Sequence, residues 1–426
     1  MLGMALATSN RSQIHSKRWR VIIAVSVGNA LEWFDFVIYG YFAVTIAKHF
    51  FPVGNETASL LLALGTFGVA FIMRPFGAII IGIYADRHGR KPALTLTISL
   101  MMIGTAIIAF TPTFYSIGLV APLLIVCARI LQGFSAGGEF GSATALLAEQ
   151  DPKRRGFFTS WQFSSQAMTA VIATASGAIL TGALSDEQFN AWGWRLPFIF
   201  GLFIGPVAYY IRRQIDESPE FHSTQISRAP FREILTGAKK GLLVAVGTVV
   251  VLTVTTYTLI FMPTFAVQQL GLPLSVGFSV GLLTSAIQVL LVPIAGTLSD
   301  RWGRLPIAYA ATIAIFFTAY PLFAGLIATP TLASLLIFQI CVGALLAVYA
   351  GVLPALMSEL FPTHVRTTGI SVSYSLGVAI FGGFAPFMNV SLIKLTGSKL
   401  IPCYYLMTAA AITLAALIGA RRLGIK

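Results

Sequence analysis

The side chains with most chemical potential are a few ionisable groups inside long apolar stretches. Glu32 and Asp35 stand three residues apart in the first stretch, and Tyr39 follows Asp35 by one helical turn. Residues at these spacings share one face of an α-helix. A carboxylate among apolar helices is costly, and a proton removes its charge. The pattern therefore predicts a proton site at Asp35, with Glu32 as the second candidate, because two neighbouring carboxylates rarely both stay ionised.

A buried cation is expected opposite these acids. Arg129 and Gln132 share a face of the fourth apolar stretch, and at about 1.5 Å per residue Arg129 reaches the depth of Asp35. An anionic substrate that takes the arginine would leave the carboxylate without its counter-charge, so that proton and substrate load together. The alternative is a permanent Asp35–Arg129 pair that only stabilises helix packing.

Arg74 precedes Pro75 in the second apolar stretch. It either caps a neighbouring carboxylate as part of the structure or faces a cavity as an anchor for anions. Other polar side chains in the stretches are candidates for a substrate cavity at mid-depth, with hydrogen bonding between helices as the alternative for each. The full set of substrate-binding candidates is Asn29, Tyr39, Arg74, Arg129, Gln132, Gln162, Gln166, Tyr257, Gln288, Tyr349, Tyr374 and Asn389.

The elements that position these residues belong to a very apolar chain. Of the 426 residues 56% are hydrophobic and 10% are charged, whereas soluble domains carry about a quarter charged residues. At about 20 apolar residues per membrane crossing, the length accommodates roughly a dozen spans and leaves no separate soluble domain. The predicted spans lie near residues 19–47, 57–85, 92–111, 118–148, 156–182, 193–213, 241–266, 274–299, 305–327, 331–358, 367–392 and 399–421.

The net charge of +13 is distributed unevenly along the chain. Most lysines and arginines fall in alternate loops, which is the positive-inside pattern and predicts that both termini and the long middle loop are cytoplasmic. A nucleic-acid partner is then unnecessary. The basic residues 11–20 before the first apolar stretch resemble a signal peptide, but that stretch is too long and carries two acids, so we interpret it as a retained span.

Metal, nucleotide and enzyme chemistry are not indicated. Cys127, Cys341 and Cys403 fall inside apolar spans, where they are small hydrophobes, and no disulfide framework or metal cluster is expected. The histidines fall in predicted loops, so no Ser/His or His/Asp set shares one depth, and no Gly-x-x-x-x-Gly-Lys-Ser/Thr loop occurs. We therefore expect neither an enzyme nor a bound cofactor, and a proton as the coupling ion.

Two loop motifs recur in the same order after about half the chain. Residues 82–91 read Gly-Ile-Tyr-Ala-Asp-Arg-His-Gly-Arg-Lys and residues 296–305 read Gly-Thr-Leu-Ser-Asp-Arg-Trp-Gly-Arg-Leu, while Glu149 to Arg155 corresponds to Glu359 to Arg366. This repetition predicts related six-helix halves at 19–213 and 241–421. They are joined by a cytoplasmic linker, 214–240, and flanked by cytoplasmic ends, 1–18 and 422–426.

The charges of the repeated loops can latch helix ends in one conformation and release them in another. The alternative is that they only anchor loops at the lipid headgroups. The latch candidates are Asp86, Arg87, Arg90 and Glu149 in the first half and Asp300, Arg301, Arg304, Glu359 and Arg366 in the second.

The repeated Gly-x-x-x-Asp-Arg-x-Gly-Arg-Lys loop resembles the most specific mark of the major facilitator superfamily. Residues 30–40, 73–78, 128–139 and 381–386 together resemble its metabolite:proton symporter family. That resemblance implies an all-α membrane protein of twelve transmembrane helices in two pseudo-symmetric six-helix bundles, working as a monomer in a bacterial inner membrane. It also maps the first-span acids and Arg129 onto positions implicated in proton coupling.

Members of this family take up citrate, tricarballylate, 2-oxoglutarate, shikimate, proline or betaine. Two buried arginines favour a small organic acid such as a di- or tricarboxylate. A zwitterionic osmolyte, held by aromatic faces, is the alternative, although the chain ends a few residues after the last span and lacks the coiled coil typical of the osmosensing branch. A drug/proton antiporter is less favoured, because residues 173–179 lack the Gly-Pro motif of such antiporters.

Overall fold

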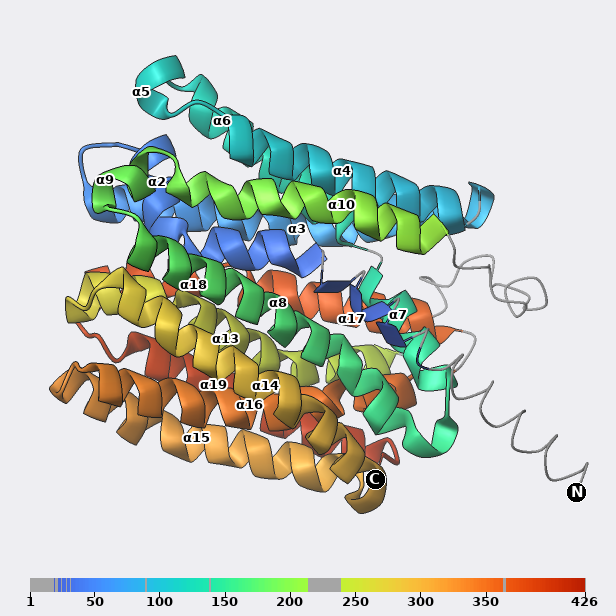
Figure 1. The fold of residues 1–426 in the computed structure, drawn as a ribbon. Coiled ribbons are helices and arrows are strands. Elements are labelled where there is room, and N and C mark those ends of the chain that lie inside the picture. Colours follow the sequence, from blue (N-terminus) through green and yellow to red (C-terminus); the bar gives the residue numbers. More distant parts are fainter. Residues whose placement is uncertain are drawn as a thin grey trace, which may run out of the picture.

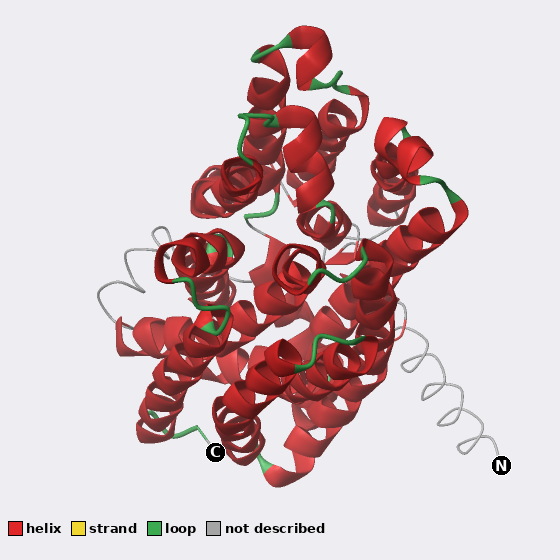
Figure 2. Cartoon of the chain, turned by 90° about the vertical axis from the view of Figure 1, so that its left-hand side faces the viewer, coloured by secondary structure: helices red, strands yellow, loops and turns green. Residues whose placement is uncertain are grey.

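The computed structural model describes residues 19, 22–23, 25–27, 29–30, 32–88, 90–137, 139–213, 239–362 and 365–425. These residues form long helices joined by short connections, with no strand among them. The long helices run side by side in one direction or its reverse (Figure 1), and a view along them shows their packed cross-section (Figure 2). The prediction of an all-α membrane protein is confirmed.

The first part of the chain begins with the helix Val25–Tyr41, which bends by 69° into α2 (Ala43–Phe50). It continues through α3 (Glu56–His88), α4 (Arg90–Phe110), α5 (Phe114–Ile117), α6 (Val120–Ser135), α7 (Glu139–Glu149), η1 (Pro152–Arg154), α8 (Arg155–Ala183), α9 (Asp186–Ala191), η2 (Gly193–Arg195) and α10 (Leu196–Arg213).

The second part consists of α13 (Lys239–Leu270), α14 (Leu274–Trp302), α15 (Arg304–Ala328), α16 (Leu332–Leu360), α17 (Arg366–Gly377), η4 (Val378–Gly382), α18 (Ala385–Thr396) and α19 (Ile401–Arg422). Within the described residues, nine helical segments are long and apolar enough to cross a membrane, and a tenth is added when the bent pair counts as one span. Most predicted span limits agree with these helices to within a few residues.

Two predicted spans are interrupted. The span near 118–148 divides into α6 and α7 at Ala136-Gly137, and the span near 367–392 divides at the π-helical turn η4. Glycines at both breaks lie against neighbouring helices: a Cβ atom on Gly137 would collide with the α3 backbone, and one on Gly383 would lie 2.6 Å from Phe71. The close approach of α3 therefore accompanies both interruptions.

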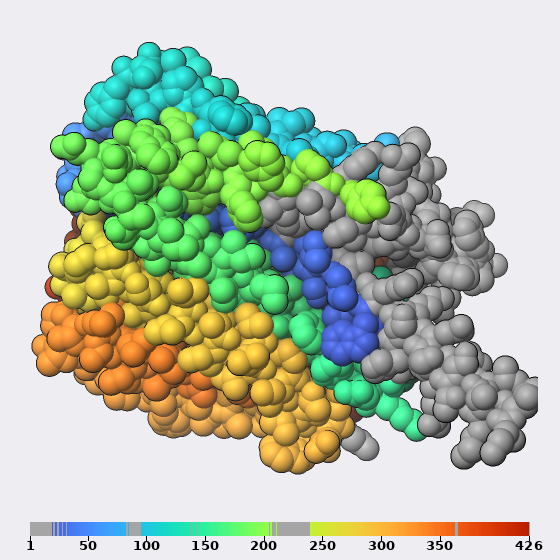
Figure 3. Space-filling view, viewed as in Figure 1, coloured from blue at the N-terminus to red at the C-terminus, as the bar shows by residue number. Residues whose placement is uncertain are grey.

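α8 and α14 lie side by side along most of their length (Figures 1 and 3). At one end Gly156 faces Gly296, and towards the other end a Cβ atom on Gly177 would lie 2.8 Å from the ring of Phe278. Lipid supplies no hydrophobic force between helices, so close packing at small residues holds such pairs together. This contact is the longest that joins the first part of the chain to the second.

The glycine contact generates a stability prediction. Gly156→Ala places a Cβ atom 2.5 Å from the Ser299 hydroxyl and 2.7 Å from Arg304 Nη1, so overpacking should lower the free energy of unfolding by about 1–3 kcal/mol. Gly182→Ala in the same helix meets nothing within 4 Å and should be neutral or slightly stabilising. Thermal unfolding of the two purified variants measures the difference, and equal midpoints would contradict the packing argument.

Candidate functional site

Asp35 lies in the interior of the first part of the chain. One of its carboxylate oxygens, Oδ2, contacts the Thr105 hydroxyl from α4 and accepts a hydrogen bond of 3.3 Å from Gln132 Nε2 on α6. The Thr105 hydroxyl is also placed to donate to the Met101 carbonyl at 3.0 Å. A threonine has one hydroxyl proton, so Thr105 donates either to Asp35 or to the Met101 carbonyl.

Arg129 is 0% exposed, and its guanidinium is surrounded mainly by rings. Its guanidinium carbon lies 4.6 Å from the centre of the Phe36 ring, 4.5 Å from Tyr39 and 5.3 Å from Phe67. Nη1 donates to Gln132 Oε1 at 2.8 Å, while Nε and Nη2 find no hydrogen-bond acceptor among the described residues. Cation–π contacts thus replace part of the lost hydration.

The expected direct pair between Asp35 and Arg129 is not formed. Gln132 joins them instead, because its amide accepts from Arg129 through Oε1 and donates to Asp35 through Nε2. The sequence predicted that Gln132 shares a helix face with Arg129. It did not predict that the Gln132 amide lies between Arg129 and Asp35.

The second acid of the first helix has a different partner. Glu32 Oε1 lies 3.2 Å from Arg74 Nη2 on α3, and the Arg74 residue is 2% exposed. The Arg74 guanidinium carbon lies 5.1 Å from the Trp33 ring, 4.8 Å from Phe36 and 5.0 Å from Phe71. Of the two interpretations of Arg74, the structure therefore shows an ion pair with a carboxylate, held inside an aromatic cage.

Residues from the second part of the chain face this ion pair. Tyr374 on α17 interacts electrostatically with both Arg74 and Glu32. Tyr257 on α13 interacts electrostatically with Arg74 and Glu32, its ring stacks on Trp33 at 6.5 Å, and its hydroxyl has no hydrogen-bond partner among the described residues. The Glu32–Arg74 pair therefore lies where the two parts of the chain meet.

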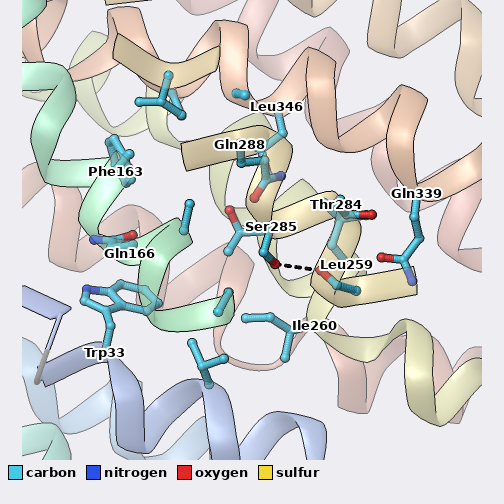
Figure 4. Close-up of a pocket in the computed structure, with 18 of the residues that line it drawn as sticks. Trp33, Phe163, Gln166, Leu259, Ile260, Thr284, Ser285, Gln288, Gln339 and Leu346 are labelled. Atoms are coloured by element: carbon cyan, nitrogen blue, oxygen red, sulfur yellow. Dashed lines mark hydrogen bonds between the residues drawn. The ribbon is translucent and has the colours of Figure 1, made fainter. Parts of the chain in front are cut away.

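A cavity of about 70 Å³ lies beside the pair, between the helix Val25–Tyr41, α8, α13, α14 and α16. Trp33 and Gln166 form its wall on one side, and Ser285, Gln288 and Gln339 face them (Figure 4). None of its lining residues is charged. The volume admits a few water molecules.

Some of the remaining substrate-binding candidates line the cavity and others hydrogen-bond between helices. Gln166 and Gln288 line the cavity. Asn29 and Gln162 hydrogen-bond to each other at 3.0 Å, the Tyr39 hydroxyl donates to the Ala63 carbonyl at 3.3 Å, and the Tyr349 hydroxyl donates to the Thr248 carbonyl at 2.6 Å. These contacts join helices to one another.

Asn389 is fully buried, and neither end of its amide is hydrogen-bonded among the described residues. Sequence reasoning missed Thr105, Trp33 and Ser285. Threonines and serines are frequent in these helices, so nothing in the sequence distinguishes Thr105 and Ser285 from the others. Trp33 could have been identified as a candidate from the sequence, because it is adjacent to Glu32.

The latch candidates of the second half meet the start of α8. The Asp300 carboxylate accepts hydrogen bonds from the backbone N–H groups of Gly156 at 2.7 Å and Phe157 at 2.9 Å. Those N–H groups belong to the first turn of a helix, where a negative charge is stabilising. Asp300 thereby ties the end of α14 to the start of α8.

Arg304 extends this latch. It donates to Asp300 at 2.8 Å and to Glu359 at 3.2 Å, and Arg155 lies 3.9 Å from Glu359. Arg366 Nε donates to the Ser358 carbonyl at 2.9 Å, and Arg301 is exposed. Glu149 interacts electrostatically with Arg366. The side chains of Asp86, Arg87 and Arg90 lie outside the described residues.

The latch can be tested by neutralising Asp300. Asp300→Asn should weaken closure of the helices at this end by about 1–2 kcal/mol, because the start of α8 loses its charged acceptor. This loss corresponds to a roughly tenfold change in the population of the closed conformation. A cysteine introduced at the buried Ser160, with the native cysteines replaced, should then react faster with a soluble maleimide. Arg301→Gln is the matched control, and an equal rate in both variants would refute the assignment.

Comparison with known proteins places this arrangement in context. The sequence pattern of the Major Facilitator Superfamily matches residues 25–386. A citrate-proton symporter of Klebsiella pneumoniae is 39% identical over 395 residues, which cover 91% of this chain and 88% of that protein. A proline/betaine transporter of Escherichia coli (strain K12) is 31% identical over 416 residues, covering 93% of this chain and 82% of that protein.

Solved structures match the fold. A proton:xylose symporter superimposes with a TM-score of 0.77 at 15% identity, covering 95% of both chains. A D-xylose-proton symporter gives a TM-score of 0.75 at 18% identity, covering 93% of this chain and 97% of that one.

Proposed function

This chain belongs to the Major Facilitator Superfamily, and on that premise we propose that it takes up a small organic acid, such as citrate, together with protons. The predicted family is confirmed, and the relatives are transporters, not enzymes. The observation that carries the choice of an anion is Arg74, a buried guanidinium directly behind the cavity wall. Arginine binds carboxylates through two parallel hydrogen bonds, which suits a di- or tricarboxylate.

The charges of the site explain why protons accompany the substrate. Glu32, Asp35, Arg74 and Arg129 carry formal charges that cancel. An anion that enters this low-dielectric region adds uncompensated negative charge, which is costly unless a proton neutralises a carboxylate. Both acids are suitable acceptors, since Asp35 has neutral partners and Glu32 shares its arginine with any entering carboxylate.

Transport proceeds by alternating access between two bundles, residues 19–213 and 241–421. The cavity between the two parts of the chain and the latch from α14 to α8 support this division. Release of the Asp300 contacts opens the latch end. The linker 214–240 and the termini, 1–18 and 422–426, lie on the cytoplasmic side of a bacterial inner membrane, as the distribution of basic residues indicates. The protein acts as a monomer.

A zwitterionic osmolyte is the second candidate substrate, because a proline/betaine transporter is among the relatives. A quaternary ammonium group would need an open aromatic face. Trp33 is the tryptophan of the cavity wall, and its ring already faces the Arg74 guanidinium at 5.1 Å. The position of Arg74 beside Trp33 therefore favours a carboxylate substrate over a quaternary ammonium compound.

A ligand screen distinguishes the two substrate classes. Citrate, tricarballylate, succinate and 2-oxoglutarate are compared with proline and betaine by thermal unfolding of the purified protein, because a ligand of the folded state raises the midpoint. At 100 times its dissociation constant, the true substrate should add about 2.7 kcal/mol of stability. Stabilisation by proline or betaine alone would overturn the carboxylate assignment.

Arg74→Gln tests the anion anchor. Loss of a charged hydrogen-bond donor should cost about 1.5–3 kcal/mol, which raises the dissociation constant of the carboxylate roughly 10- to 100-fold. Arg74→Lys should be intermediate, since lysine keeps the charge and loses the planar fork. Arg421→Gln, at the exposed end of α19, is the control, and an affinity for citrate unchanged in Arg74→Gln would remove Arg74 from the site.

A further inference from the structure

The helix α13 packs on different neighbours along its length. Near its start, a Cβ atom on Gly247 would lie 2.5 Å from the Ala416 Cβ atom of α19. Further along, the ring of Tyr257 lies 5.2 Å from that of Phe71 on α3 and 6.5 Å from that of Trp33 on the helix Val25–Tyr41. The residues that α13 contributes to the cavity are Leu252, Thr256, Leu259 and Ile260. The start of α13 is therefore tied to α19, whereas its later turns face the cavity and the first part of the chain.

A side chain of α19 contacts the backbone of α13 between these two stretches. The Thr413 hydroxyl accepts a hydrogen bond of 3.0 Å from the Val251 N–H and donates one of 2.9 Å to the Gly247 carbonyl. In a regular α-helix these two backbone groups bond to each other, because each N–H donates to the carbonyl four residues earlier. Thr413 is 0% exposed. It thus supplies both groups of one helical hydrogen bond with a second partner from outside the helix.

A third helix contacts the same turn of α13. The Tyr349 hydroxyl of α16 donates to the Thr248 carbonyl at 2.6 Å, and this carbonyl is the regular helical acceptor for the Leu252 N–H. Gly247 lowers the helical preference of the turn further. Side chains that insert into the hydrogen-bond ladder of a helix are one of the few causes of sharp helix bends. The turn from Gly247 to Leu252 is therefore prepared for bending.

The two hydroxyls change what a bend at this turn would cost. A bend inside a membrane separates N–H and C=O groups, and lipid offers them no other partner. A threonine hydroxyl can donate one hydrogen bond and accept others, so Thr413 keeps the Gly247 carbonyl and the Val251 N–H bonded after they separate. Tyr349 does the same for the Thr248 carbonyl. The cavity-lining turns of α13 can then move without leaving these three groups unpaired.

We propose that the turn from Gly247 to Leu252 is a pivot on which the cavity-lining part of α13 moves relative to α19. Thr413 and Tyr349 are its positioning residues, because their hydroxyls keep the backbone of the turn hydrogen-bonded as it bends. The proposal rests on the alternating access of the proposed function and is independent of the choice of substrate.

Hydrogen exchange of the α13 backbone tests the pivot in the full chain without any substrate. Purified protein is transferred to deuterated buffer, and mass spectrometry follows the peptide of residues 245–256. Thr413→Val keeps the shape of the side chain and removes the hydroxyl, so opening of the turn becomes more costly. The peptide should exchange roughly 2- to 10-fold more slowly, which is the effect of one hydrogen bond. A threonine that only holds α19 against α13 would have the opposite effect, because its loss would loosen the contact and speed exchange.

Control variants separate the hydroxyl from the packing. Thr413→Ser keeps the hydroxyl and should exchange at the native rate. Thr408→Val removes an exposed hydroxyl of α19 that donates to the Tyr404 carbonyl of its own helix, and it should also exchange at the native rate. Tyr349→Phe should slow the same peptide, and it decides by the same criterion where Thr413→Val fails to fold. Unchanged or faster exchange in either hydroxyl-deleted variant of the pivot overturns the proposal, as does equal slowing in Thr408→Val.

Uptake into proteoliposomes distinguishes a pivot from a binding role. With an imposed pH gradient, Thr413→Val should lower the maximal rate of citrate uptake roughly 2- to 10-fold and leave KM little changed, because the hydroxyl acts on a conformational step. Thr413→Ser should restore the rate. A raised KM at the native maximal rate contradicts the pivot. If the native protein takes up no citrate, the organic-acid assignment fails, whereas the exchange measurement still decides on the pivot.

Discussion

A charge buried among apolar helices costs several kcal/mol unless a partner compensates it, and the centre of this protein is arranged around that cost. Glu32 is compensated by Arg74, and Asp35 is compensated by hydroxyl and amide groups of α4 and α6. Arg129 is compensated mainly by ring faces. Because each partner comes from a different helix, the charges determine how the first helix sits against its neighbours.

Close approach of backbones is the second requirement, and glycine provides it. A Cβ atom on Gly133 or Gly77 would collide with the backbone of the facing helix, which brings α3 and α6 together and sets Arg74 and Arg129 in neighbouring layers. Gly156 and Gly296 do the same for α8 and α14, where Asp300 caps the first turn of α8. At the latch end the contacts between the two parts of the chain are polar, whereas apolar packing joins α8 and α14 along the rest of their length.

The buried charges form two separate clusters. One lies behind the wall of the cavity, and the other lies inside the first part of the chain, joined to it by Phe36, whose ring contacts both arginines. The opposite wall of the cavity carries the neutral polar groups of Ser285, Gln288 and Gln339.

The sequence alone determined the helical membrane fold, most span limits, the repeated loop motifs and the residues that carry charge at depth, because apolar length, loop charge and repetition are local properties. It also placed Glu32 and Asp35 on one helix face, yet only the tertiary structure decided that they have different partners. Three residues rotate a helix by about 300°, so the two side chains diverge by about 60°, enough for one to face α3 and the other α4 and α6. The packing of helices against one another also decided where the fourth and eleventh predicted spans break. It likewise decided that the Gln132 amide lies between two charges. The pattern along a single chain does not contain that information.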